Sequence, residues 1–170
     1  MNGVSGKILI AYASRRGSTA EIAQAIGSEL EALGNTVEVA EMKGIRSVGG
    51  FRAVVIGAPV YLARIGKDIS AFVARFGSDL SPVPVAAFAV GIAPVDPRVG
   101  SVEDALGQLR AVLAPVKPVA ITMFAGRLDL ARMSFIERTL TGAMKVLTGD
   151  FRDWDAIRAW ARGLPAVFGF

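Results

Sequence analysis

The chain has 170 residues, a length that predicts one domain spanning residues 1–170. It contains no cysteine and no histidine, which excludes disulfides, thiolate nucleophiles, imidazole bases and metal sites built from those side chains. The 19 lysines and arginines exceed the 15 acids, and this mild positive charge favours anionic partners, although a basic protein without a charged ligand is the simpler interpretation.

Short apolar runs alternate with amphipathic stretches along the whole chain. Strands are expected at residues 7–12, 36–42, 52–59, 83–91 and 117–126, and helices at residues 18–33, 67–76, 101–113, 134–147 and 153–162. This alternation, repeated five times, is typical of a parallel sheet with helices on both faces. In such sheets ligands bind beyond the carboxyl ends of the strands, so the loops that follow the strands are the candidate site.

Two helices begin with the pattern of a capping box. Ser18 and Glu21 form this pattern at the start of the first helix, and Ser134 and Glu137 form it at the start of the fourth. Gly149 is expected to end the fourth helix. These signals place the polar loop before residue 18 directly at a helix N-terminus.

The loop after the first strand reads "ASRRGST" over residues 13–19. A helix N-terminus offers free backbone N–H groups and a positive dipole, which together favour phosphate. Ser14, Ser18 and Thr19 add hydroxyl groups, and Gly17 lets the backbone close around an anion. The loop matches neither the dinucleotide nor the nucleoside-triphosphate motif, so an ordinary capped helix after a polar loop is an equal alternative.

Four stretches resemble a known family. "ASRRGST" resembles the FMN-phosphate loop of flavodoxins, which reads T/S-x-T-G-x-T. "VVIGAPVYLARIGKDISAFV" (residues 54–73) resembles the second flavin loop of menaquinone-dependent protoporphyrinogen IX dehydrogenases, and "FAGRLDLARMSFIERTL" and "GDFRDWDAIRAWA" resemble their C-terminal region. The likeness covers nearly the whole chain. It implies an α/β flavodoxin-like three-layer sandwich with a five-stranded parallel sheet in the order 2-1-3-4-5, and FMN as cofactor.

The resemblance also implies that three loops hold FMN. Their cofactor-binding residues are Ser14, Arg15, Arg16, Gly17, Ser18, Thr19, Pro59, Val60, Tyr61, Leu62, Ala63, Gly91, Ile92, Ala93 and Pro94. Tyr61, the only aromatic residue of its loop, is expected to stack on the flavin or merely to pack on the loop. The third loop has no Tyr or Trp, which indicates either an open flavin face or weak flavin binding. The flavin N5 carries the chemistry, so no catalytic residue is assigned, and no metal site is expected.

Arginines from different loops are expected at the rim of the flavin site. Arg15 and Arg16 are adjacent and cannot easily both turn inward, so we predict that they lie mainly at the rim. Arg64 would approach from the second loop and Arg127 from the last, and such a rim suits a substrate with propionate groups. Simple solvation of these arginines is the alternative.

The stretch before the last helix is amphipathic. Its apolar stripe is Met133, Ile136, Leu140, Met144 and Leu147, and its polar stripe is Ser134, Arg138, Thr141, Lys145 and Thr148. The simpler interpretation is a helix that covers the sheet. The alternative is a helix that lies on an acidic membrane, with Phe135 in the apolar part and with Arg127, Arg132, Arg138 and Lys145 as the basic residues.

Three functions follow from these patterns. The first is an FMN-dependent oxidoreductase that reduces quinone and oxidises a porphyrinogen-like substrate in heme biosynthesis. The second is a flavodoxin-type electron carrier that serves a redox protein and has no small-molecule substrate of its own. The third is a scaffolding domain without cofactor. Residues 1–12 lack the pattern of a signal peptide, so we expect a cytoplasmic protein with no nucleic-acid partner. Peripheral contact with the inner face of the membrane is the alternative.

Overall fold

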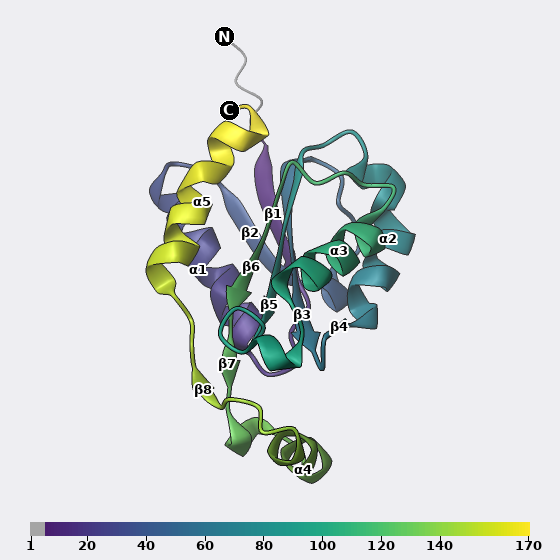
Figure 1. The fold of residues 1–170 in the computed structure, drawn as a ribbon. Coiled ribbons are helices and arrows are strands. Elements are labelled where there is room, and N and C mark those ends of the chain that lie inside the picture. The colour runs from purple at the N-terminus through teal and green to yellow at the C-terminus, as the bar shows by residue number, and fades with distance from the viewer. Residues whose placement is uncertain (1–5) are drawn as a thin grey trace.

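A computed structural model describes residues 6–170, so residues 1–5, part of the stretch examined for a signal peptide, lie outside the described residues. Its centre is a parallel sheet (Figure 1). From edge to edge, the strands are β2 (Val37–Glu41), β1 (Lys7–Tyr12), β3 (Phe51–Tyr61), β5 (Val85–Gly91) and β6 (Ala120–Ala125). Counted along the chain as five strands, this is the order 2-1-3-4-5, so the predicted topology is confirmed.

Two pairs of helices cover the sheet and complete the three layers. The helices are α1 (Ser18–Ala32) and α5 (Trp154–Phe168) on one face, and α2 (Lys67–Leu80) and α3 (Val102–Leu113) on the other (Figure 1). Alternate residues of β1 serve the two faces, since Ile8 and Ile10 pack with α1 and α5 whereas Leu9 packs with α2 and α3. A strand with both faces buried reads as a continuous apolar run, which explains the sequence of β1.

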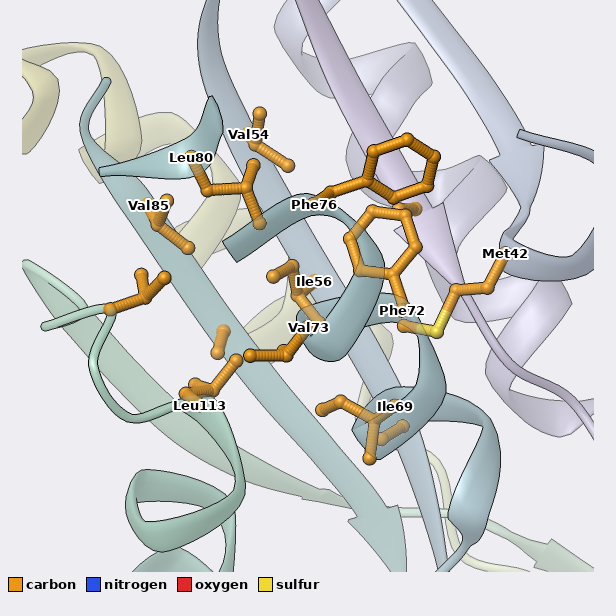
Figure 2. Close-up of a cluster of buried hydrophobic side chains, with 14 of the residues drawn as sticks. Met42, Val54, Ile56, Ile69, Phe72, Val73, Phe76, Leu80, Val85 and Leu113 are labelled. Atoms are coloured by element: carbon orange, nitrogen blue, oxygen red, sulfur yellow. The ribbon is translucent and has the colours of Figure 1, made fainter. Parts of the chain in front are cut away.

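The core under α2 and α3 is densely apolar. Figure 2 shows Phe72 and Phe76 of α2 packed beside Ile56 of β3 and Met42. The two phenyl rings lie 5.1 Å apart between centroids at an angle of 56°, a tilted arrangement that aromatic pairs favour. Burial of this cluster fixes α2 against the sheet and therefore fixes the loop that leads into it.

Short elements connect the main ones. They are η1 (Met42–Gly44), β4 (Arg64–Ile65), η2 (Pro97–Val99) and η3 (Leu130–Arg132). β4 pairs antiparallel with the end of β3, so the expected loop at residues 59–66 is instead a tight hairpin. α2 and α5 extend beyond their predicted ends, and α5 continues through Pro165.

Residues 127–150 form an excursion between β6 and α5, which we call the 127–150 segment. β7 (Arg127–Leu128) and β8 (Gly149–Asp150) pair at its base, and α4 (Phe135–Ala143) lies within it. Figure 1 shows α4 beyond the carboxyl ends of the strands, away from both faces of the sheet. The expectation of a sheet-covering helix is therefore wrong. Most of its apolar stripe is exposed; only Met133 is buried.

The capping box of Ser134 and Glu137 is present at the start of α4, as predicted. The predicted end is wrong: α4 stops at Ala143, and Lys145, with φ of 54°, takes the left-handed conformation after it. Gly149 lies in β8 instead. No helix within residues 6–170 is long and apolar enough to cross a membrane.

Candidate functional site

The loop between β1 and α1 turns sharply at Gly17, whose φ is 87°. This left-handed conformation favours glycine, and Gly17 is the N-cap residue of α1. The predicted capping box is therefore wrong, because Ser18 is already the first helical residue. The Ser18 Oγ instead accepts a hydrogen bond of 3.1 Å from the backbone N–H of Arg127. The base of the 127–150 segment is thus tied to the helix N-terminus.

Arg15 and Arg16 both reach the same carboxylate. An Nη of Arg15 lies 2.7 Å from Glu137 Oε1, and an Nη of Arg16 contacts Glu137 Oε2. The Glu137 side chain is 11% exposed, whereas the side chains of Arg15 and Arg16 are 52% and 22% exposed. Arg16 is thus more buried than the predicted rim position implies, because both arginines pair with Glu137 of α4.

The environment of Arg16 is unusual for a cation. Burial first, and then the charge of Arg15, lower the pKa of its guanidinium, which still stays charged. Its Nε is buried and has no hydrogen-bond partner among the described residues. Arg132 donates a hydrogen bond of 3.1 Å to the Arg16 carbonyl, so the 127–150 segment also holds the backbone of the loop.

The hairpin after β3 is strained at its tip. Leu62 and Ala63 both have positive φ, 48° and 62°. Asn and Gly are the usual residues of such a turn, and other side chains raise its energy. Gln108 of α3 stabilises the turn: its Nε2 donates to the Ala63 carbonyl at 2.8 Å, and its Oε1 accepts from the Ile65 N–H at 3.3 Å.

Tyr61 directly precedes the turn of this hairpin and pairs with Arg64. The Arg15 guanidinium stacks over its ring, 4.3 Å from the centroid, in a cation–π contact. The Tyr61 hydroxyl is buried and has no hydrogen-bond partner in the described part of the chain. A buried hydroxyl usually has a partner, so this group is available to a ligand.

The loop after β5 is organised by Asp96, which is almost fully buried. Its carboxylate accepts hydrogen bonds from the Arg98 guanidinium at 2.8 and 2.9 Å, and Arg98 lowers its pKa to about 2. Asp96 also accepts from the Leu147 N–H at 3.4 Å, and Arg98 donates to the Lys145 carbonyl at 3.0 Å. This Asp96–Arg98 pair fastens the C-terminal end of α4 to the loop after β5.

A second ionic cluster lies at the base of the 127–150 segment. Glu21 of α1 contacts Arg152 and lies 3.3 Å from an Nη of Arg127; Asp150 lies 2.7 Å from Arg152. Hydrogen bonding to Arg152 lowers the pKa of Glu21, and it lowers that of Asp150 to about 2. Arg127 thus faces Glu21 rather than an open rim, and its side chain is 19% exposed.

The three loops enclose two neighbouring spaces that share lining residues such as Val60 and Ile92. The larger is a mostly apolar cavity of about 350 Å³ between the hairpin, the start of α3 and the 127–150 segment, which contributes Leu128, Thr141 and Val146. The smaller, about 60 Å³, lies between the residue 15–19 loop and Gly126. A basic groove of about 470 Å³ also borders Tyr61 and Arg15.

Most of the predicted site residues converge on these spaces. The larger cavity is lined by Val60, Tyr61, Leu62, Ala63, Ile92 and Ala93, and the smaller by Arg15, Arg16, Ser18, Thr19, Pro59, Val60, Tyr61, Gly91, Ile92 and Arg127. Ser14 and Arg64 line the basic groove instead, while Gly17 and Pro94 line none of the three. Gly17 instead shapes the turn into α1.

Sequence reasoning missed several residues of the site. Gln108 and the Asp96–Arg98 pair position two of the loops, and Glu137 binds both loop arginines. The stretch "DPR" is the one local signal, since an Asp before Pro favours the turn seen in η2. The 127–150 segment also adds Leu128, Thr141 and Val146 to the wall of the larger cavity, which Ile92 and Ala93 of the third loop line as well.

The parallel sheet in this order, with a site at its carboxyl edge, defines a flavodoxin-like α/β protein. The family model described as a flavodoxin domain matches residues 9–155, and the chain belongs to this family. It is 24% identical over 168 residues to protoporphyrinogen IX dehydrogenase (quinone) of Escherichia coli K12, covering 92% of this chain and 93% of the relative.

Two solved structures show the same fold. A short-chain flavodoxin associated with a non-canonical PDU bacterial microcompartment has a TM-score of 0.64 at 14% identity, covering 96% of this chain and 99% of its own. A flavoprotein of Lactobacillus acidophilus NCFM, solved in complex with FMN, has a TM-score of 0.53 at 15% identity, covering 69% and 93%. At these identities the likeness establishes the fold.

Proposed function

We propose that this protein is an FMN-dependent oxidoreductase that links a quinone to the oxidation of a porphyrinogen-like substrate, as a step of heme biosynthesis. The observation that carries the proposal is the likeness to the quinone-linked dehydrogenase of E. coli, which extends over 92% of this chain. The flavodoxin domain itself supports FMN as the cofactor.

The residues at the carboxyl edge of the sheet fit FMN. The N-terminus of α1 and the hydroxyl groups of Ser18 and Thr19 suit the phosphate, and the apolar cavity suits the flavin ring. Two buried donors, Arg16 Nε and the Tyr61 hydroxyl, are available for ligand oxygens. FMN supplies the electron-accepting ring, and the protein binds it, orients it and excludes water.

Tyr61 is the residue that we expect to tune the flavin. An aromatic ring against the flavin disfavours the electron-rich reduced form and therefore lowers its reduction potential. The strained hairpin and Gln108 fix the position of Tyr61, so they act on the flavin through it.

The basic groove suits the anionic part of the substrate. It is lined by Arg15, Lys43, Arg64 and Lys67 and by one acid, Asp68. Asp68 lies 3.7 Å from Lys43, which leaves Arg64 and Lys67 as cations without an ion pair among the described residues. Guanidinium pairs well with carboxylate, so this groove is the place that we assign to propionate groups.

The exposed face of α4 suits contact with an acidic membrane, where a quinone is dissolved. Phe135 and Ile136 are 80% and 70% exposed. Arg138 and Lys145 are exposed on the same segment. Arg127 and Arg132 contact α1 and its loop, so we assign them a smaller part in this contact than the sequence suggested.

A flavodoxin-type electron carrier is the second candidate, favoured by the flavodoxins among the structural neighbours. Turnover separates the two. The FMN-loaded protein is mixed with protoporphyrinogen IX and menadione, and porphyrin fluorescence is followed. We expect porphyrin formation that depends on both FMN and quinone. An electron carrier gives none, yet exchanges electrons with a flavodoxin reductase.

A further inference from the structure

The contact between Glu137 and the two loop arginines joins segments 122 residues apart in the sequence. Removing a carboxylate from water costs free energy, and ion pairs with two guanidinium groups offset that cost. Glu137 also accepts the Ser134 N–H at 2.9 Å through Oε2, so the carboxylate fixes the first turn of α4 as well. The same anion therefore serves both the loop and α4.

Arg16 contacts Glu137 and also lines the smaller space at the N-terminus of α1, together with Ser18 and Thr19. A phosphate bound at this helix N-terminus would therefore lie beside the Arg16 guanidinium. The phosphate and the Glu137 carboxylate would then compete for the same cation.

The two ends of α4 are fastened differently. Glu137 fastens the first turn to residues of the phosphate loop. The Asp96–Arg98 pair fastens the other end at Lys145 and Leu147, and it involves no residue of that loop. A ligand that takes over the loop arginines thus frees only the first turn of α4.

We propose that Glu137 is an internal anion that competes with the phosphate of FMN for Arg15 and Arg16, so that FMN binding releases the first turn of α4. The proposal rests on FMN binding as proposed above. A phosphate monoester has more charge than a carboxylate and three acceptor oxygens, and the N-terminus of α1 favours it further. The phosphate therefore displaces Glu137, and breaking that contact lowers the net affinity for FMN.

The variant Glu137→Gln tests this competition. Glutamine also serves in a capping box, so the variant removes the charge and keeps the start of α4. Dissociation constants for FMN and for riboflavin, which lacks the phosphate, are measured by quenching of flavin fluorescence. We expect FMN to bind about tenfold more tightly, a change of about 1.4 kcal/mol, while the affinity for riboflavin stays the same.

Asp129→Asn is the matched control. Asp129 is a carboxylate of the same segment that pairs with Arg132 at 3.8 Å, and it contacts neither Arg15 nor Arg16. Its replacement should change FMN affinity less than twofold. Hydrogen exchange of the wild-type protein gives an independent measure, since amides in the first turn of α4 (residues 135–138) should exchange faster with FMN bound than with riboflavin bound.

Other outcomes overturn the proposal. Weaker FMN binding by Glu137→Gln would make Glu137 a clamp that positions the arginines for the phosphate. Equal changes for FMN and riboflavin would mean that α4 acts as a lid, without competition. The variant Gly17→Asp distinguishes a failure of this proposal from a failure of the proposed FMN site. If the variant loses FMN while Glu137→Gln changes nothing, only the competition is wrong. If the variant keeps FMN, the proposed phosphate site is wrong as well.

Discussion

The sheet and the 127–150 segment are held in place by different forces. The sheet is fastened by buried apolar side chains on both faces, such as Leu9 and Phe88, and hardly by charge. The segment has exposed apolar residues and is fastened to the rest of the chain by Glu137, Asp96 and Arg127. We therefore expect the stability of the sheet to depend little on salt, whereas the segment that walls the cavity should respond to charge, salt and ligands.

A matched pair of leucines tests the difference between the sheet and the 127–150 segment most directly. Leu109 of α3 is fully buried, whereas Leu140 of α4 is 43% exposed. Leu109→Ala should lower the free energy of unfolding by about 3 kcal/mol, because it leaves a cavity in the core. Leu140→Ala should change it by less than about 0.5 kcal/mol. Urea unfolding measures both, and similar losses for the two variants would contradict the comparison.

Two glycines at opposite ends of α1 test the phosphate loop. Gly17 and Gly34 both have positive φ, 87° and 90°, so a side chain strains the backbone equally at either position. Gly17→Asp also places a carboxylate in the proposed phosphate loop, where a Cβ at residue 17 lies 3.0 Å from an Nη of Arg132. We expect FMN affinity to fall at least about 100-fold, or about 2.7 kcal/mol, for Gly17→Asp alone.

The measurement is a flavin titration of both variants after a check of their folding by circular dichroism. Gly34→Asp should lose stability but keep its affinity for FMN, because nothing lies within 4 Å of the added Cβ. Full flavin occupancy of Gly17→Asp would show that the phosphate lies elsewhere.

Membrane binding tests the proposed role of the 127–150 segment. The double variant Arg138→Gln and Lys145→Gln should bind acidic liposomes about 30-fold less tightly, at about 1 kcal/mol per basic residue near the surface. Arg158→Gln with Arg162→Gln on α5 removes the same charge far from α4 and should have little effect. Co-sedimentation at rising salt measures this, and equal binding to neutral and anionic vesicles argues against the contact.

The basic groove is tested by Arg64→Gln. KM for a propionate-bearing substrate should rise about fivefold, since one exposed ion pair contributes about 1 kcal/mol, while FMN affinity stays unchanged. The same change in Arg16 is informative beside it, because Arg16 borders the phosphate space instead. Loss of FMN in the Arg16 variant would mean that Arg16 serves the cofactor, and an unchanged KM in both would remove the proposed rim.

The smallest expected effect concerns acid. The pKa of Asp96 is lowered to about 2 by Arg98, so its contribution is complete above pH 4 and is lost as the pH falls toward 2. The C-terminal end of α4 should therefore loosen in that range before the sheet unfolds. Hydrogen exchange measured from pH 5 to pH 2 checks this. In the Asp96→Asn variant, the amides at the C-terminal end of α4 should exchange fast at every pH. Simultaneous opening of sheet and segment would contradict it.

Residues 7–12 and 83–91 illustrate what the sequence settles by itself. Their apolar runs, and the glycine-bearing loop after the first, predict buried parallel strands and a helix N-terminus at the correct place, because these signals depend on neighbours in the chain. The capping box of Ser134 and Glu137 is equally local, and it was predicted correctly.

Only the tertiary structure determines where the ends of these elements meet. The sequence places Glu137 in a helix cap, and only the path of the 127–150 segment brings it to Arg15 and Arg16. The same holds for Asp96 and Leu147. A local pattern records the preference of the backbone for helix or strand, whereas an ion pair between distant residues depends on how the whole sheet orders its loops. For that reason the sequence alone predicted a phosphate loop, and the fold added the acid that occupies its arginines.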